Sequence, residues 1–364
     1  MNTLFKYIKF KYLILLSLVA LFLNFKFLFI FLFLFFFKFY LRLKKIYFLI
    51  SAHIFLSFFI IDMVAPKLIS NDNTYFIESN IKYSINDKYG YHPIKNKIFE
   101  ENVYKNNKFL KKTTYTINEN GHRISPINNK NYCIFFHGGS ITFGQSVNDE
   151  ETLPYYTYKE LDKKFSVFNY GFNGYGPHQF LSKIENNYLE TPNICSKTLV
   201  IYLFIDDHVG RVVGKRSWGD KSPRYIFNQG EVVQKGFFSD YPFKIIMKMR
   251  KSIRNSFTIS KIILTDLTTL KDKKLFIRIL EKIENEISYN FNDVKFLYIV
   301  WNTKKNENQI IYEHFKNKKV LKINDLNIPE KYQKNGIQGD NHPTKEFYEI
   351  LSRSVAKIVL DFSY

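Results

Sequence analysis

From Asn131 to the C-terminus, short apolar runs alternate with segments whose apolar residues recur every three or four positions. The runs predict buried strands, and the periodic segments predict helices that cover them. The predicted strands are Tyr132–Phe136, Ser166–Phe168, Thr198–Phe204, Val294–Val300 and Val320–Ile323. The predicted helices are 152–161, one that opens at Pro177, 275–287, 306–315 and a last one over 347–358. This alternation indicates an α/β domain over 131–364 with a parallel sheet covered on both faces.

Two stretches depart from this alternation. Residues 67–130 are polar, and the alternation in Thr114–Ile117 predicts a strand. We therefore expect a linker with a small β appendage that packs against the sheet and spaces it from a membrane. An insertion at about 206–241 contains Tyr225–Phe227 and Glu231–Val233 on either side of a turn, which predicts a hairpin. We expect this insertion to be otherwise non-helical and to cover substrate.

Residues 1–66 have the composition of a membrane anchor with two or three transmembrane helices. Tyr12–Phe37 is almost wholly apolar, interrupted by Asn24 and Lys26, and Ile46–Ile61 is a second uncharged run. As one helix the first run spans about 39 Å, longer than the roughly 30 Å hydrocarbon core. It could instead form two short spans that turn at Asn24 to Lys26. A cleaved signal peptide is the alternative, but a second apolar run follows.

Basic residues set the expected orientation. Lys38, Arg42, Lys44 and Lys45 form a predicted loop between the two runs, and positive residues stay on the cytoplasmic side. The second run then exits and leaves everything after Pro66 outside the cytoplasm. The lysines before the first run also favour the cytoplasmic side. Both ends of the first run then lie on that side, so this run crosses the membrane an even number of times. Three spans in total therefore fit better than two. The sequence thus predicts a multi-pass membrane protein with an extracytoplasmic domain.

Composition narrows the choice of partners. The chain has 364 residues and a formal net charge of +20, spread over lysines interleaved with Asn and Ile. Because the positive charge is dispersed along the chain, a general preference for these amino acids in the proteins of the source explains it better than a dedicated surface for anionic lipid or polymer. No nucleic-acid motif accompanies the charge, so nucleic acid is not an expected partner. Cys133 falls in a predicted strand and Cys195 in a loop; we expect neither a disulfide between them nor a metal site.

Candidate chemistry collects at four predicted strand ends. They are Gly138-Gly139-Ser140, Asn169–Gly176, Ile205–His208 and Asp340–Pro343. A strand that stops at two glycines and a serine can present a nucleophile, because glycine permits a sharp turn there.

Around Ser140 and Thr142-Phe143-Gly144, over Asn169–Gly176 and over Asp340–Pro343, the chain resembles the SGNH, or GDSL-like, esterase and acyl-hydrolase superfamily. The resemblance covers the chain from about Asn131 onward. The resemblance implies a flavodoxin-like three-layer α/β/α fold. It also implies that Ser140 is the nucleophile, His342 the general base, and Asp340 the residue that orients the imidazole. The backbone N–H groups of Ser140 and Gly174 would face the oxyanion, where glycine lets the backbone approach closely.

Three departures from the family pattern matter. Gly139 stands where many members have Asp, a position without chemistry. Asp340 and His342 are separated by one residue, where many members have two. Asp206 stands where an Asn oxyanion donor is usual, and an ionised carboxylate cannot donate a hydrogen bond. An active site then needs either a protonated Asp206 or another donor, such as His208 or Asn173.

The sequence therefore predicts a membrane-anchored serine esterase that hydrolyses O-acyl or O-acetyl esters outside the cytoplasm through an acyl-enzyme. The expected substrate is an acylated envelope glycan or lipid, with Asn173, His208 and Arg211 as candidate contacts. An O-acyltransferase on an envelope glycan would use the same residues, with a sugar hydroxyl in place of water. Asp206 motivates another alternative, a catalytically weak or dead glycan-binding assembly factor. No cofactor is expected, and the oligomeric state stays open.

Overall fold

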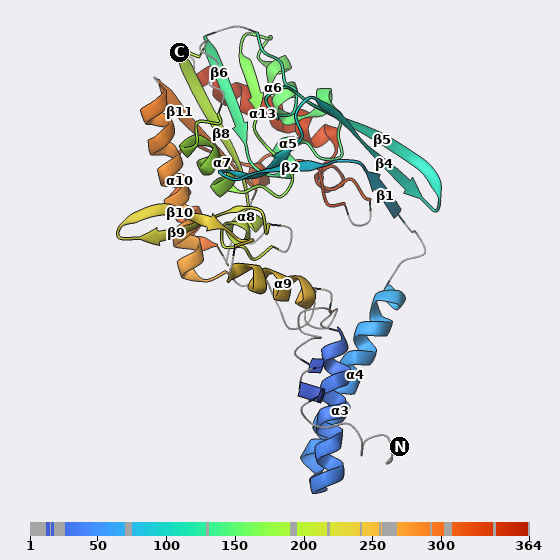
Figure 1. Cartoon of the computed structure of the whole chain (residues 1–364). Coiled ribbons are helices and arrows are strands. Elements are labelled where there is room, and N and C mark those ends of the chain that lie inside the picture. The colour runs from blue at the N-terminus through green and yellow to red at the C-terminus, as the bar shows by residue number, and fades with distance from the viewer. Residues whose placement is uncertain are drawn as a thin grey trace. The chain divides into compact units, whose positions relative to one another are not determined.

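The computed structural model describes residues 12–14, 16–17, 26–69, 75–128, 131–189, 195–216, 219–240, 242–254, 256, 268–291, 293–301, 308–337 and 340–362. The chain divides into two compact units (Figure 1). One unit comprises Met1–Asn73, Lys215–Asp220 and Ser239–Leu267, and the other comprises Thr74–Gly214, Lys221–Phe238 and Thr268–Tyr364. The apolar helices belong to the first unit and all the described sheets to the second.

A five-stranded parallel sheet forms the centre of the second unit. Its strands lie in the order β12-β11-β8-β6-β7, and every neighbouring pair is parallel. They are β6 (Tyr132–His137), β7 (Ser166–Asn169), β8 (Lys197–Ile205), β11 (Val294–Trp301) and β12 (Val320–Lys322). The predicted parallel architecture is confirmed, with the strand order of flavodoxin-like folds. The order reverses between β6 and β8, and ligand sites in such sheets lie at the C-terminal ends of those strands.

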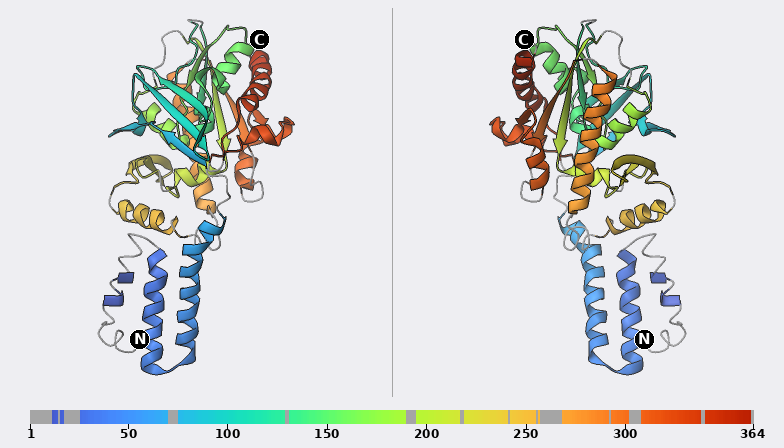
Figure 2. Two further views of the ribbon diagram at one scale, coloured as in Figure 1. Left: turned by 90° about the vertical axis from the view of Figure 1, so that its right-hand side faces the viewer. Right: turned by 90° about the vertical axis from the view of Figure 1, so that its left-hand side faces the viewer.

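Helices cover both faces of this sheet (Figure 2). Along β8, Ile201 and Leu203 face one helical layer, while Tyr202 and Phe204 face the other, because successive strand side chains point to opposite faces. The first layer contains α6 (Leu153–Glu160) and α13 (Lys345–Phe362), and the second contains α7 (Pro177–Glu185), α10 (Leu270–Asn290) and α11 (Gln309–Phe315). The sequence thus buries apolar residues on both sides of each central strand.

The predicted β appendage belongs to the same unit as the parallel sheet. It is built from an antiparallel sheet in the order β1-β4-β5 and from the pair β2-β3. Arg123 connects it to the parallel sheet, because isolated bridges join this residue to Ile117 of β5 and to Asn169 of β7. The strands are β1 (Tyr75–Ser79), β2 (Tyr83–Asn86), β3 (Gly90–Pro93), β4 (Lys97–Lys105) and β5 (Lys108–Ile117).

The insertion after β8 contains a helix as well as the predicted hairpin. The hairpin is confirmed, with β9 (Pro223–Asn228) paired to β10 (Glu231–Phe237). The expectation of an otherwise non-helical insertion is wrong, because α8 (Asp207–Val212) begins directly after β8. Its buried Val209 and Val212 are one turn apart, and six residues are too few for a helical period to stand out in the sequence.

Cys133 and Cys195 form a disulfide, which corrects the expectation that they stay unpaired. Cys133 lies at the start of β6, and Cys195 lies just before β8. Because these strands are adjacent and parallel, their N-terminal ends meet and bring the two Cα atoms to 5.5 Å. The bond thus depends on a strand pairing that spacing along the sequence does not reveal.

Reduction of this disulfide is expected to lower the free energy of unfolding by roughly 2–4 kcal/mol, because the bond constrains the unfolded chain. Thermal melting of the full chain with and without reductant measures the loss. Cys195→Ser is the control, since its melting should not respond to reductant. Free thiols that titrate in the denatured, unreduced wild type would contradict the assignment.

The first unit contains two apolar helices that lie side by side, α3 (Lys26–Leu43) and α4 (Ile46–Ile69) (Figure 1). Their aromatic rings meet, for example Phe36 with Phe55 at 5.4 Å between centroids. Among the described residues, Ile46–Ala65 is long and apolar enough to cross a membrane.

The predicted basic loop between these helices is shorter than expected, because Lys38 and Arg42 belong to α3 and only Lys44 and Lys45 form the turn. The first predicted run is described only in part. The predicted turn at Asn24 lies outside the described residues, and α3 begins at Lys26. The helix α9 (Phe243–Arg254) also belongs to this unit.

A buried lysine in the second unit makes its stability depend on pH. Lys183 on α7 is 1% exposed, and its Nζ lies 5.0 Å from the centre of the Tyr175 ring. Burial lowers the pKa of Lys183 to about 7. An unfolded lysine titrates near pH ~10.4, so between about pH 7 and pH 10 the unfolded chain binds more protons and stability rises with pH.

We expect the wild type to gain about 1 kcal/mol of stability per pH unit in this window, relative to Lys183→Met, which has no proton to lose. Melting curves of both chains at pH 7 and pH 9 measure the difference. Equal shifts of the two chains between these values would contradict the burial of a titrating ammonium group.

Candidate active site

Ser140 begins the short helix α5 (Ser140–Phe143), and two glycines separate it from the end of β6. A Cβ on Gly138 would lie 2.3 Å from Thr142 Oγ1 and 3.1 Å from the Leu203 carbonyl oxygen, so only glycine fits this turn. The turn places the Ser140 hydroxyl at the C-terminal end of β6, where the strand order of the sheet reverses.

His342 and Asp340 precede α13 and meet Ser140 at this sheet end. His342 Nε2 lies 2.7 Å from Ser140 Oγ, and His342 Nδ1 lies 2.5 Å from Asp340 Oδ1. The backbone N–H of His342 also donates to Asp340 Oδ1, at 3.1 Å. The structure therefore brings the three predicted catalytic side chains into one hydrogen-bonded chain. A hydroxyl, an imidazole and a carboxylate in this order can move a proton from the hydroxyl to the ring.

The Asp340 carboxylate is held from its other side as well. Ser146 Oγ donates to Asp340 Oδ2, and Asn335 Nδ2 donates to the same atom at 2.5 Å. Burial by itself raises the pKa of Asp340, but hydrogen bonds from His342, Ser146 and Asn335 outweigh burial and bring the pKa down to about 2. The carboxylate thus stays ionised where histidines titrate, so it can stabilise an imidazolium.

The loop after β7 runs beside the serine turn and carries Gly174. Tyr170 N–H donates to the Phe136 carbonyl at 2.8 Å, which fixes the start of the loop on β6. Gly174 has a φ of +77°, in the left-handed region that glycine adopts without steric cost. Within the described part of the chain, the backbone N–H groups of Ser140 and Gly174 have no hydrogen-bond partner. Both are available to an oxyanion.

Asp206, the doubtful oxyanion residue, has partners on the side of α11. Its Oδ1 accepts hydrogen bonds from Asn308 Nδ2 at 2.6 Å and from the Tyr312 hydroxyl at 2.5 Å. Two donors on one oxygen suit an ionised carboxylate, and such a group cannot donate to an oxyanion. These contacts favour a different donor over a protonated Asp206.

His208 lies against the residue that precedes the nucleophile. A Cβ on Gly139 would lie 3.1 Å from His208 Nε2 and 2.5 Å from Arg211 Nη1, so the glycine makes room for α8. His208 Nδ1 is 2.6 Å from the Tyr202 hydroxyl, whereas Nε2 is buried and has no partner among the described residues. Burial, helped by the Arg211 charge, lowers the pKa of His208 well below its usual range, so the ring is neutral.

Arg211 and Asn173, the other two candidate substrate contacts, belong to the packing of the Gly174 loop. Arg211 is buried; its Nη1 donates to the Tyr175 carbonyl at 2.6 Å and its Nε to Asp207 Oδ2 at 2.7 Å. The Asn173 carbonyl accepts from the Tyr91 hydroxyl at 3.0 Å. The Asn173 side-chain oxygen is buried without a partner among the described residues. Arg211 thus supports the loop rather than offering a free cation to substrate.

Three residues close to the triad escaped the sequence prediction: Glu101, Arg123 and Ser146. Glu101 had a usable signal, because it alternates with Phe99 and Val103 on the buried face of β4, and a carboxyl group on such a face is unusual. Arg123 and Ser146 lie in polar stretches and stand out neither by spacing nor by neighbours.

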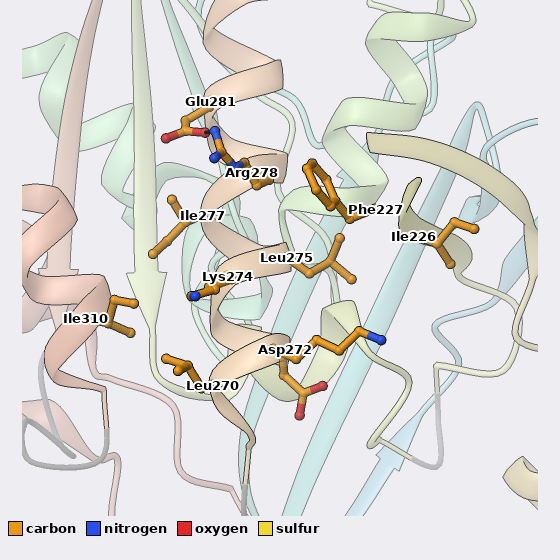
Figure 3. A pocket seen from close by; sticks show the side chains of 11 residues that line it. Ile226, Phe227, Leu270, Asp272, Lys274, Leu275, Ile277, Arg278, Glu281 and Ile310 are labelled. Atoms are coloured by element: carbon orange, nitrogen blue, oxygen red, sulfur yellow. Dashed lines mark hydrogen bonds and ion pairs between the residues drawn. The ribbon is translucent and has the colours of Figure 1, made fainter. Parts of the chain in front are cut away.

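A pocket of about 1000 Å³ lies elsewhere, beside α10 (Figure 3). Ile226 and Phe227 of the hairpin face Leu275 of α10 across it, and Arg278 pairs with Glu281 at 2.9 Å on its wall. None of the triad residues lines this pocket, so it is distinct from the candidate active site.

No protein-family model and no curated protein matches this chain. It is similar to a solved structure from Desulfitobacterium hafniense, described as a lipolytic protein of the G-D-S-L family (12% identity, 63% of this chain and 99% of that chain covered, TM-score 0.35). It is also similar to a carbohydrate acetylesterase family member from Sinorhizobium meliloti (8%, 64% and 98%, TM-score 0.36) and to an acetyl xylan esterase from Butyrivibrio proteoclasticus (8%, 79% and 87%, TM-score 0.37). These likenesses are too distant to carry an argument about the activity of this chain.

Proposed function

We propose that this chain is a membrane-anchored serine esterase of SGNH type that hydrolyses O-acyl or O-acetyl esters through an acyl-enzyme. The observation that carries the proposal is the hydrogen-bonded chain from Ser140 through His342 to Asp340, with distances of 2.7 and 2.5 Å. At these distances a ring nitrogen can take the hydroxyl proton as the oxygen attacks.

The reaction follows from this geometry. Ser140 Oγ attacks the ester carbonyl carbon while its proton passes to His342 Nε2, and Asp340 stabilises the imidazolium. The N–H groups of Ser140 and Gly174 stabilise the oxyanion. The bond to the alcohol then breaks, and His342 returns the proton to the leaving oxygen. A water molecule, deprotonated by His342, attacks the acyl-enzyme in the same way and releases the acid.

His208 is the third oxyanion donor in this proposal. Burial raises the pKa of the Tyr202 phenol well above its usual range, so the phenol keeps its proton and can donate it to His208 Nδ1. A neutral ring that accepts at Nδ1 carries its own proton on Nε2, the atom that lies beside Gly139 without a partner among the described residues. His208 would thus do what an Asn does in the family and what Asp206 cannot.

We expect His208→Ala to lower kcat about 10²-fold, the usual cost of one oxyanion donor, with little change in KM. Tyr202→Phe should lower kcat by a smaller factor, because the ring is then free to place its proton on Nδ1. Steady-state kinetics with a chromogenic acetyl ester measures both. An unchanged kcat in His208→Ala would assign the third donor to another group, such as the Asn173 side chain.

The proposed location is a membrane, with the esterase domain outside the cytoplasm. The apolar α4 and the Phe-rich α3 would form two spans, with Lys44 and Lys45 between them on the cytoplasmic side. The disulfide between Cys133 and Cys195 supports this placement, because such bonds persist in oxidising compartments. An acylated envelope glycan or lipid is the substrate class that this location favours.

Incubation of the full chain in detergent with a chromogenic acetyl ester tests the proposal. Steady release of the chromophore supports an esterase, and the absence of release would refute it. Addition of an unacetylated glycan acceptor separates hydrolysis from transfer, since an acyltransferase would pass the acetyl group to the glycan. A catalytically dead glycan-binding factor would show neither reaction.

A further inference from the structure

A line of hydrogen bonds runs from the β appendage of strands β1 to β5, called the β segment below, to the far side of Asp340. Glu101 of β4 is 2% exposed, and the hydroxyl of Tyr115 on β5 donates to its Oε1 at 3.0 Å. Ser146 Oγ lies 3.4 Å from the same Glu101 oxygen and also contacts Asp340 Oδ2. One serine hydroxyl thus lies between two buried carboxyl groups, one of which belongs to the proposed triad.

The β segment also fixes the backbone of Ser146. The φ of this residue is +68°, in the left-handed region that residues other than glycine seldom adopt. Its N–H donates to the Tyr115 hydroxyl at 2.9 Å, and its carbonyl accepts from Lys111 Nζ at 2.9 Å. Both partners come from β5, so the β segment sets where the Ser146 hydroxyl points. Strained residues of this kind persist where their surroundings determine them, often at functional sites.

The number of protons available to the Glu101–Ser146 contact indicates whether Glu101 is protonated. Ser146 has one hydroxyl proton, and its short contact with the ionised Asp340 uses it. The contact between Glu101 and Ser146 is then attractive only if Glu101 brings a proton of its own. Burial raises the pKa of Glu101 and the Asp340 charge adds to this, against the lowering effects of the Tyr115 hydrogen bond and of Lys111 and His342.

We propose that Glu101, as the neutral acid, and Ser146 are positioning residues that hold Asp340, and through it His342, in line with Ser140. Both act through the carboxylate and not on the ester. This inference rests on the proposed esterase function. It gives the β segment a part in the catalytic apparatus, whereas its sequence predicted only a spacer.

Full-length variants in detergent test this role. Glu101→Ala and Ser146→Gly are each expected to lower kcat about tenfold with KM little changed. Glycine suits the left-handed backbone, so Ser146→Gly removes the hydroxymethyl group without adding backbone strain. Their double variant should lose no more than about twentyfold in kcat, because both residues serve one contact, whereas independent effects would multiply to about a hundredfold.

Glu101→Gln keeps the shape of the side chain and a hydrogen-bond donor, so it should retain most of the wild-type kcat with an unchanged pH profile. Glu100→Ala is the matched control, because this half-buried neighbour on β4 pairs with Lys112, an exposed residue away from the triad.

Several outcomes would overturn the inference. They are an unchanged kcat in either single variant, multiplicative losses in the double variant, and a Glu101→Gln chain that is as slow as Glu101→Ala or has a shifted pH profile. Melting temperatures of the same variants report the coupling without turnover: the shared contact predicts non-additive shifts, and additive shifts would contradict it. A wild type that does not hydrolyse esters would refute the proposed function, and the melting temperatures would still decide whether Glu101 and Ser146 share one contact with Asp340.

Discussion

Replacement of Ser140 by alanine is expected to abolish ester hydrolysis and leave the fold intact. Loss of the nucleophile of a serine triad costs on the order of 10⁶ in kcat, because no other group can form the acyl-enzyme. The Ser140 hydroxyl makes its hydrogen bond to His342, so the substitution removes one contact and little volume. Turnover of a chromogenic acetyl ester by equal amounts of the two full-length chains gives the ratio.

The triad should also behave as a unit. His342→Ala is expected to be about as slow as Ser140→Ala, and the double variant no slower than either, because each change already removes the shared proton-transfer chain. Ser352→Ala on α13 is a suitable control, since among the described residues this buried serine bonds at the Glu349 carbonyl of its own helix and to no other group. Turnover by Ser140→Ala above about 1% of the wild-type rate would contradict the assigned role.

Arg123→Met is expected to lower the free energy of unfolding by roughly 3–5 kcal/mol, the cost of breaking a buried ion pair by removing one partner. The guanidinium is 1% exposed, and its Nε pairs with Asp149 Oδ1 at 2.8 Å. Its other four N–H groups donate to backbone carbonyls, those of Thr114, Phe143, Gly144 and Val147. Methionine would leave a carboxylate and four carbonyls without their donor.

A fall in melting temperature on the order of 10 °C is the expected readout. Arg353→Met is the control, because Arg353 is an exposed partner of Glu349 on α13 and such pairs contribute little. Arg123→Lys should recover only part of the loss, since an ammonium group cannot reproduce the fork of five donors. A melting temperature within about 2 °C of the wild type for Arg123→Met would show that these contacts do not stabilise the fold.

The elements that the sequence predicted best are those whose signal is local. The strand β8 covers Lys197–Ile205 and follows its apolar run to within one residue at each end. Thr152, the first residue of the predicted helix 152–161, caps α6, and its hydroxyl accepts the Tyr155 N–H at 3.3 Å. Burial on both faces and cap chemistry are properties of neighbouring residues, so a single sequence carries them.

Contacts between distant segments carried no comparable signal. Ser146 and Asp340 are 194 residues apart, and Glu101 and Ser146 are 45 apart, so no motif joins them. The disulfide was missed because it depends on the pairing of β6 with β8. The proximity of Ser140 to His342 was predicted only through the resemblance to a family, and not from any spacing.

The most direct test of the proposed function is covalent labelling of the wild-type chain with a fluorophosphonate, followed by peptide mapping of the adduct. The reagent phosphonylates a serine only when a neighbouring base activates its hydroxyl. The geometry of Ser140 and His342 predicts one adduct, on Ser140, that forms in the wild type and is lost in His342→Ala. An unlabelled wild-type chain, or an adduct mapped to any other residue, would contradict the assignment of Ser140 as the nucleophile.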